Sequence, residues 1–215
     1  MDFLKPETFF DLSSFAHRSL WKSGLPVWSA LEALQHLPFD RGCIEIEIPE
    51  GVFLKHKELI SIGKGTVIEP GAMIEGPCII GENCKIGHGA YLREFSILGN
   101  DCSVGHSAEI KHSLILNGAA VTHFVYVGNS IIGNKVNLGA GVKCSNLRLD
   151  RKEIYCGPDR VATGLKKMGA IVGDGVQIGC NCVLNPGTLI GKRAIFYPLL
   201  NVGGFVKEGS IIKDV

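Results

Sequence analysis

The sequence has no marked excess of charge of either sign and no long apolar run. Its formal net charge is +1 over 215 residues, which gives no electrostatic indication of a nucleic-acid partner. No apolar stretch approaches the ~18 residues of a membrane span. The first residues, MDFLKPETFFD, lack the charged start and apolar core of a secretory signal. We therefore expect a cytoplasmic protein of one or two domains, with 46% apolar residues available for its core.

What the sequence has instead is a repeat of six residues. From residue 62 every sixth position is aliphatic, through nine positions in register. They are Ile62, Ile68, Ile74, Ile80, Ile86, Leu92, Leu98, Val104 and Ile110. Neither a helix, with its period of 3.6, nor a strand, with its period of 2, keeps one apolar position on that spacing. The pattern is typical of a parallel β-helix.

Each repeat also has a fixed internal order. The fifth position holds a small residue, as at Thr66, Cys84 and Ala108, and the second position is usually glycine. This is the hexapeptide signature of the left-handed β-helix, in which the aliphatic residue fills the interior and the small one turns in beside it. Three repeats make one triangular coil, so residues eighteen apart stack about 4.8 Å above one another. The sequence predicts an all-β, left-handed parallel β-helix.

The remaining segments divide the chain. Residues 1–40 carry Phe, Leu and Trp at helical spacing, which predicts a short N-terminal helical cap over the open end of the β-helix; a partner-binding role is the alternative. Residues 41–61 alternate apolar and polar side chains like a half-buried strand. The β-helix domain is expected over 41–215, with a loop insertion at 147–170.

The repeat loses a residue twice after position 110. The aliphatic positions then fall at Ile115, Val121, Val127, Ile132 and Leu138. Such interruptions tend to mark functional sites, because a strict local rule has been given up there. His123 lies in this region, and we interpret it as part of a break.

Cysteine and histidine spacing gives no strong indication of a metal. Three of the eight cysteines, Cys78, Cys84 and Cys102, occupy the small-residue position of their repeats, where a thiol acts as a small hydrophobe. Cys180 and Cys182 have no second pair at zinc-finger spacing, and disulfides are rare in the cytosol. His88 and His106 are eighteen apart and should stack as an exposed ladder. We expect no metal.

The segments around the interruptions carry a resemblance to a known family. They read EIK at 109–111, THFVYVGN at 122–129, VNLGAG at 136–141 and SNLRLDRK at 145–152. Together they resemble the C-terminal acetyltransferase domain of bacterial and archaeal glucosamine-1-phosphate N-acetyltransferase/UDP-N-acetylglucosamine pyrophosphorylases. The resemblance covers about 62–200, and stand-alone homologues share the inserted loop.

The resemblance implies roles for ten residues. His123 matches the general base that takes a proton from the sugar's ammonium, and Glu109 matches the carboxylate that orients it. Asn146 and Lys152 complete the catalytic group, and Lys152 also contacts the phosphate. The substrate-binding group would comprise Arg93, Lys111, Tyr126 and Asn137. The acetyl-CoA group would comprise Ala140, whose N–H matches an oxyanion donor, and Cys180.

The implied activity is acetyl-CoA-dependent N-acetylation of an amino-sugar 1-phosphate, with glucosamine 1-phosphate as the expected acceptor. The family feeds UDP-N-acetylglucosamine synthesis for the cell envelope and works as a homotrimer with sites between subunits. No L-x-x-G-x-G-T-R-M segment of a nucleotidyltransferase occurs. Uridyltransferase activity is therefore not expected, and a separate nucleotidyltransferase is a possible partner.

Some positions depart from the family pattern. Leu147 stands where the bacterial members have an aromatic residue, and Cys180 stands where they have a serine. These departures leave open a non-catalytic or regulatory protein that binds a sugar phosphate or nucleotide sugar, and an acyltransferase acting on a UDP-sugar. A zinc enzyme with a three-histidine site is a further alternative, but His106, His112 and His123 lack the close pair that it needs.

Overall fold

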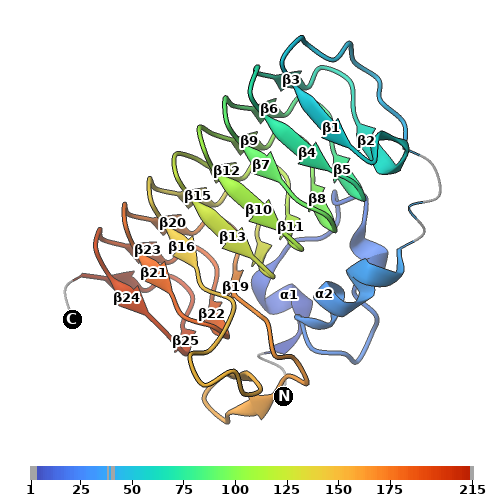
Figure 1. Ribbon diagram of the computed structural model, residues 1–215. Coiled ribbons are helices and arrows are strands. Elements are labelled where there is room, and N and C mark those ends of the chain that lie inside the picture. Colours follow the sequence, from blue (N-terminus) through green and yellow to red (C-terminus); the bar gives the residue numbers. More distant parts are fainter. Residues whose placement is uncertain (1–3, 38, 40–41, 214–215) are drawn as a thin grey trace.

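The chain winds into a left-handed parallel β-helix (Figure 1). The structure is a computed structural model that describes residues 4–37, 39 and 42–213. Within these residues, three parallel sheets of eight strands each form the sides of the coil. We number the sheets 1, 2 and 3 in the order in which the chain first enters them. This architecture confirms the fold that the six-residue repeat predicts.

Each coil passes through the three sheets in turn, and we name the corners 1–2, 2–3 and 3–1 after the sheets that they join. Sheet 1 contains β1 (Phe53–Lys55), β4 (Met73–Glu75), β7 (Tyr91–Leu92), β10 (Glu109–Lys111), β13 (Tyr126–Gly128), β16 (Lys143–Cys144), β21 (Val183–Leu184) and β24 (Asn201–Val202). Sheet 2 contains β2 (Ile60–Ile62), β5 (Cys78–Ile80), β8 (Ser96–Leu98), β11 (Leu114–Ile115), β14 (Ile131–Ile132), β19 (Ala170–Val172), β22 (Thr188–Ile190) and β25 (Phe205–Val206). Sheet 3 contains β3 (Val67–Ile68), β6 (Lys85–Ile86), β9 (Ser103–Val104), β12 (Ala120–Val121), β15 (Asn137–Leu138), β20 (Gln177–Ile178), β23 (Ile195–Phe196) and β26 (Ile211–Ile212).

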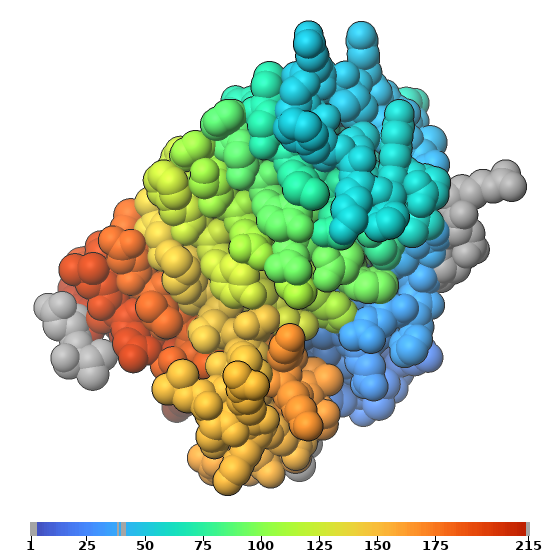
Figure 2. All heavy atoms as spheres, in the orientation of Figure 1, coloured from blue at the N-terminus to red at the C-terminus, as the bar shows by residue number. Residues whose placement is uncertain are grey.

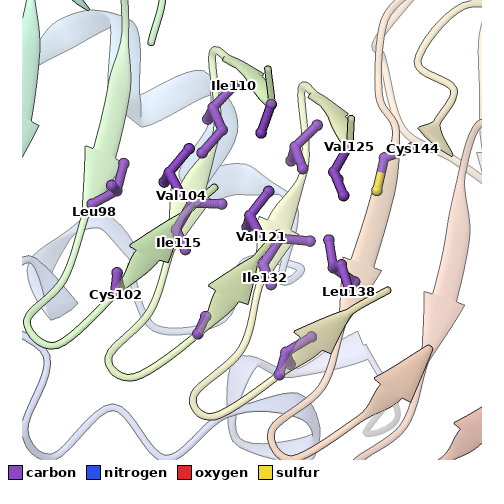
Figure 3. Close-up of a cluster of buried hydrophobic side chains, with 14 of the residues drawn as sticks. Leu98, Cys102, Val104, Ile110, Ile115, Val121, Val125, Ile132, Leu138 and Cys144 are labelled. Atoms are coloured by element: carbon purple, nitrogen blue, oxygen red, sulfur yellow. The ribbon is translucent and has the colours of Figure 1, made fainter. Parts of the chain in front are cut away.

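The interior of the coil is filled by the predicted aliphatic series. Leu98, Ile115 and Ile132 lie in successive strands of sheet 2 and point into the coil (Figure 3). Each is at most 1% exposed, and burial of such a side chain stabilises the fold by about 1.5–3 kcal/mol. The small-residue position behaves as expected too, since Cys102 is completely buried.

The buried cysteines are structural. All eight cysteines are free thiols. The Cys84 thiol donates to the Gly99 carbonyl oxygen at 3.2 Å, and burial raises the pKa of the Cys78 thiol to about 12. A thiol with so high a pKa is not a nucleophile at neutral pH.

The two shortened repeats lie at corner 1–2, at His112 and Asn129. Partners in sheet 2 on either side of Asn129, such as Ile115 and Ile132, are 17 positions apart. Both His112 and Asn129 have φ 47°, the left-handed conformation of a tight turn. His123 lies at corner 3–1, inside a full repeat. The interpretation of His123 as part of a break is therefore wrong, because the missing residues are lost at the opposite end of the sheet 1 strands.

The N-terminal segment covers the side of the β-helix. It contains α1 (Pro6–Phe9), η2 (Arg18–Leu20), α2 (Ser29–Ala33) and η3 (Leu34–His36); a further short helix, η4 (Lys57–Leu59), joins β1 to β2. The apolar side chains of the N-terminal segment share one buried cluster with outward-pointing residues of sheet 2, including Ile97, Leu114, Ile131 and Leu189. The expectation that it covers the open end is wrong, because sheet 2 presents an apolar outer face that needs a cover.

Residues 42–52 lie at the open end instead. Ile44 pairs with Ile62 in a parallel bridge, and Ile44, Ile46 and Ile48 pack partly buried against the coil interior. The half-buried strand predicted over 41–61 is therefore only partly present: 42–52 has a single isolated bridge, and β1, η4 and β2 follow it.

The inserted loop folds back on the same apolar cluster. It contains the antiparallel hairpin of β17 (Tyr155–Cys156) and β18 (Val161–Ala162). Ile154, Cys156 and Met168 are buried with the N-terminal segment. Figure 2 shows the loop, gold to orange, beside the blue N-terminal segment below the green coils. The described residues include no helix that is long and apolar enough to cross a membrane.

Candidate active site

Three residues that the sequence assigns to catalysis and cofactor binding stack at corner 3–1. The His123 carbonyl oxygen accepts from the Gly141 N–H at 2.8 Å, and the Ala140 carbonyl oxygen accepts from the Asn181 N–H at 2.8 Å. These bonds place His123, Ala140 and Cys180 at the same position of three successive coils. Stacked coils are about 4.8 Å apart, so the expected base and the expected oxyanion donor are neighbours.

His123 is exposed and unrestrained. Its side chain makes no hydrogen bond or ion pair with any residue that the structure describes. The neighbouring Phe124, which is 57% exposed, packs edge-on against His106 with ring centroids 5.1 Å apart. The imidazole is thus open to a ligand at the corner.

The structure confirms the predicted histidine ladder in the two coils that precede His123. The rings of His88 and His106 stack with centroids 5.6 Å apart and planes 6° apart. The Nδ1 atom of each ring lies within hydrogen-bond distance of a carbonyl oxygen one coil below, 2.6 Å from Pro70 and 2.9 Å from His88. Because a carbonyl oxygen only accepts, Nδ1 carries the proton in both rings. His123 occupies the next position of this ladder.

The Ala140 N–H is available as a donor. It has no acceptor among the described residues. Gly141 beside it has φ +76°, and a Cβ there would lie 2.1 Å from the Asn181 Oδ1 atom. Phe124 and Asn181 adopt the same left-handed conformation at this position of the neighbouring coils, with φ 56° and 57°, so it is the contact with the Asn181 side chain that favours glycine here.

The outer face of sheet 1 carries the predicted phosphate-binding cations, and both are already paired. Glu109 accepts from Arg93 Nη1 at 3.1 Å. Glu94, which sequence reasoning missed, lies 3.7 Å from Arg93 Nε and 3.8 Å from Lys111 Nζ. Burial lowers the pKa of Arg93, but the hydrogen bond to Glu109 and the charge of Glu94 outweigh it, so the net pKa is raised.

Arg93 keeps one unused donor. Its Nε atom is buried and has no hydrogen-bond partner within the described ranges, and buried donors of this kind normally have one. Glu94 approaches this atom only at ion-pair distance. An anion that enters the cluster would find this N–H free.

Glu109 lies one coil from His123 and does not contact it. No hydrogen bond joins the two side chains in the part of the chain that is described. The orienting role of Glu109 therefore stays a prediction. Its carboxylate does act on a neighbour: burial raises the pKa of the Tyr126 hydroxyl, and the charge of Glu109 adds to the rise.

Gly128 makes room for two of the expected substrate contacts. A Cβ at this residue would lie 2.5 Å from the Tyr126 hydroxyl oxygen and 2.8 Å from Asn146 Nδ2. Asn146 in turn donates to Asn129 Oδ1 at 2.6 Å. Tyr126, Asn146 and Asn129 thus form a polar row over Gly128, from mid-sheet 1 to corner 1–2. Asn129 was not assigned from the sequence, although it is the last residue of the motif at 122–129.

Two expected residues lie apart from this row. Asn137 is on β15 of sheet 3, between Ala120 and Gln177, and so faces away from Arg93 and Lys111. Lys152 is exposed in the loop, where only its backbone N–H is bonded, to Asp150 at 3.2 Å. Their roles stay predictions.

Known proteins resemble the chain over most of the β-helix. The protein-family model described as the GMPPB C-terminal domain matches residues 74–196, more than half of the chain. The bifunctional sugar-1-phosphate nucleotidylyltransferase/acetyltransferase of Sulfurisphaera tokodaii is 39% identical over 106 residues, which are 48% of this chain and 26% of that protein. The bifunctional protein GlmU of Listeria monocytogenes is 29% identical over 190 residues, covering 73% of this chain and 36% of that protein.

The chain therefore spans about a quarter to a third of the length of these relatives. Among solved structures, the UDP-N-acetylglucosamine acyltransferase from Campylobacter jejuni aligns with 71% of this chain and 66% of that chain, at 15% identity and a TM-score of 0.42. The sequence matches confirm the resemblance that the motifs carry.

Proposed function

Because the chain belongs to the family of the GMPPB C-terminal domain, we propose that it is an acyltransferase that moves the acetyl group of acetyl-CoA to the amine of an amino-sugar 1-phosphate. Glucosamine 1-phosphate is the simplest acceptor of this kind. The observation that carries the proposal is the pairing of His123 and the free Ala140 N–H at corner 3–1, at the start of the sheet 1 strands whose other end carries the cations. The acetyltransferase in the name of the Sulfurisphaera relative supports the reaction class.

The chemistry needs one base and one oxyanion donor. His123 takes a proton from the sugar's ammonium, and the nitrogen then attacks the thioester carbon; proton transfer of this kind is the usual task of a histidine base. The Ala140 N–H donates to the oxygen that becomes negative in the tetrahedral intermediate. The attacking nitrogen loses a second proton as the intermediate collapses and the C–S bond breaks. The CoA thiolate takes one of the two protons, and the other leaves to solvent. Glu109 orients the imidazolium, and Cys180 contacts acetyl-CoA.

The phosphate enters the charged cluster. Its oxygens take charge-assisted hydrogen bonds from Arg93 and Lys111 and displace Glu94 from both cations. Tyr126 and Asn146 hold the sugar, and Lys152 contacts the phosphate. Asn137, which lies on sheet 3, reaches the sugar from a neighbouring subunit. No metal takes part in this scheme.

The active form in this proposal is a homotrimer in the cytoplasm that supplies UDP-N-acetylglucosamine synthesis. Two exposed apolar residues on neighbouring strands of sheet 3 support an assembly surface, since Ile195 on β23 is 41% and Ile211 on β26 58% exposed. Light scattering should give the mass of three chains; a monomer at micromolar concentration would contradict this part. Uridyl transfer would need a separate nucleotidyltransferase.

A binding protein without transferase activity is the second candidate. The observation that favours it is the pairing of both cations with Glu94 and Glu109, which neutralises the cluster without a ligand. Such a protein would bind glucosamine 1-phosphate and release no CoA thiol.

The test is release of free thiol from acetyl-CoA with glucosamine 1-phosphate as the acceptor. Glucose 1-phosphate is the matched control, because it differs only in a hydroxyl at the position of the amine. Release with the amine and none with the hydroxyl supports the proposal. Equal release with both acceptors, or none with either, contradicts it.

Replacing Gly128 with alanine tests the polar row. The new methyl group displaces the Tyr126 hydroxyl and the Asn146 amide, so kcat/KM should fall about 10- to 100-fold. Folding should be little affected, because the backbone of Gly128 is not in the left-handed region. Gly203→Ala is the control: it lies in the same column of sheet 1, and its nearest neighbour is 3.4 Å away. Equal losses in both variants would contradict the proposed contacts.

A further inference from the structure

A pocket of about 370 Å³ opens at corner 1–2. Leu31 and His36 of the N-terminal segment form one wall, Lys166 and Lys167 at the end of the loop form another, and His112 and Asn129 form the floor. Its volume is in the range of small-molecule sites. Both of the segments that the simple repeat does not require, the N-terminal segment and the loop, thus meet here.

The floor consists of the two shortened repeats. His112 and Asn129 are the residues at which the coil loses one position, as described above. Each of these corners has one residue fewer than the other corners, and the pocket opens at the same place. The interruptions of the repeat therefore coincide with this pocket and not with the corner that holds His123.

The wall formed by the end of the loop is basic, and its two lysines are free to bind a ligand. Lys166 and Lys167 are exposed, and their ammonium groups form no ion pair with any residue in the described ranges. Burial lowers the pKa of His112, while the hydrogen bond that its Nε2–H donates to the Leu31 carbonyl oxygen at 2.9 Å acts in the opposite direction. The other groups that face the pocket are the imidazole of His36, the amide of Gln35 and the carboxylate of Glu32. An anion is thus met by two unpaired cations.

The pocket continues the polar row of sheet 1. Lys111 directly precedes His112, and Asn129 holds Asn146 at 2.6 Å beside Tyr126. From Tyr126 to Asn129 the strand advances about 10 Å at 3.3 Å per residue. A ligand whose first phosphate meets Arg93 and Lys111 would therefore place any substituent of that phosphate at the mouth of this pocket.

We propose that the pocket binds the nucleoside end of a nucleoside-diphosphate amino sugar. The second phosphate contacts Lys166 and Lys167, and the nucleoside lies against the partly buried Leu165 with amide partners in Gln35 and Asn129. The inference rests on the proposed function and refines its acceptor: a nucleotide-linked amino sugar is a better substrate than the free sugar 1-phosphate. The described shape and charge suit this ligand, because the pocket combines cations with apolar walls and amides.

The first arm of the experiment compares acceptors. The wild-type chain should use UDP-glucosamine with a kcat/KM about tenfold or more above that for glucosamine 1-phosphate, since two further charge-assisted contacts form. The double variant Lys166→Gln/Lys167→Gln should lose that advantage, with the value for glucosamine 1-phosphate within about twofold of wild type. Lys85→Gln/Lys207→Gln, which removes two exposed lysines elsewhere, should keep the preference. Equal use of both acceptors by the wild type, or equal losses for both in the double variant, overturns the inference.

The second arm does not depend on catalysis. UDP, GDP and dTDP are titrated by calorimetry into the wild type and the Lys166/Lys167 variant. Binding of at least one nucleotide that weakens about tenfold in the variant supports the pocket even if no acetyl transfer is detected. If glucosamine 1-phosphate is acetylated and none of the three nucleotides binds, the proposed function stands and the pocket assignment fails.

Discussion

Replacing His123 with alanine is expected to lower kcat for acetyl transfer by about 10²- to 10⁴-fold, the usual contribution of a general base. The side chain is exposed and makes no hydrogen bond within the described residues. The variant should therefore fold and bind the acceptor as the wild type does. Stopped assays of thiol release at saturating acetyl-CoA give the value.

The histidine ladder supplies the matched control. His88 occupies the same corner position two coils away, and its ring stacks on His106. His88→Ala removes the same imidazole from the same kind of turn, so its kcat should remain within about twofold of wild type. A large loss in His88→Ala, or an unchanged kcat in His123→Ala, would show that the base lies elsewhere.

Replacing Leu114 with alanine is expected to lower the free energy of unfolding by about 2–5 kcal/mol. Leu114 points outward from β11, yet it is completely buried under the N-terminal segment. Truncation leaves a cavity between sheet 2 and its cover, which costs both burial and packing. Denaturation with urea, followed by circular dichroism, measures the change.

An outward residue without a cover is the control for this prediction. Val67 points outward from β3 in sheet 3 and is 60% exposed, so Val67→Ala should change the free energy of unfolding by less than about 0.5 kcal/mol. If Leu114→Ala were equally harmless, the N-terminal segment would not be packed on sheet 2, and the pocket at corner 1–2 would lose one wall.

The six-residue period predicts the coil because the position that recurs every six residues is the one whose side chain points inward. Ile110 and the other members of the series need only the local strand geometry to reach the interior. The same rule predicts the stacking of His88 on His106, which the structure confirms. What lies within one coil, or between adjacent coils, could thus be read from the sequence.

Outward-pointing residues are different, because their surroundings depend on segments far along the chain. The apolar outer face of sheet 2, with Ile97 and Leu114, was visible in the sequence only as extra aliphatic residues, and the N-terminal segment was assigned to the open end instead. Glu94 is a different case: it adjoins Arg93 in sequence and lies one coil from Lys111, so the coil register was sufficient to predict its contact with both cations.

The position of the shortened repeats shows the limit most clearly. The five-residue step from Ile110 to Ile115 shows that this repeat lacks one residue. Which corner of the coil lacks it can be decided only once the strands are paired. His123 was linked to a break by proximity in sequence, but its corner is intact. The broken corner belongs to His112 and Asn129, where the structure has the basic pocket.

The most direct test of the central claim is the fate of the acetyl group itself. The chain is incubated with glucosamine 1-phosphate and acetyl-CoA labelled with ¹³C in the carbonyl, and the acceptor is examined by NMR. The account predicts a ¹³C amide on the sugar nitrogen that forms with the wild type and at a rate at least about a hundredfold lower with His123→Ala. A folded wild-type protein that binds the acceptor and yields no labelled amide, or an ester in its place, would contradict it.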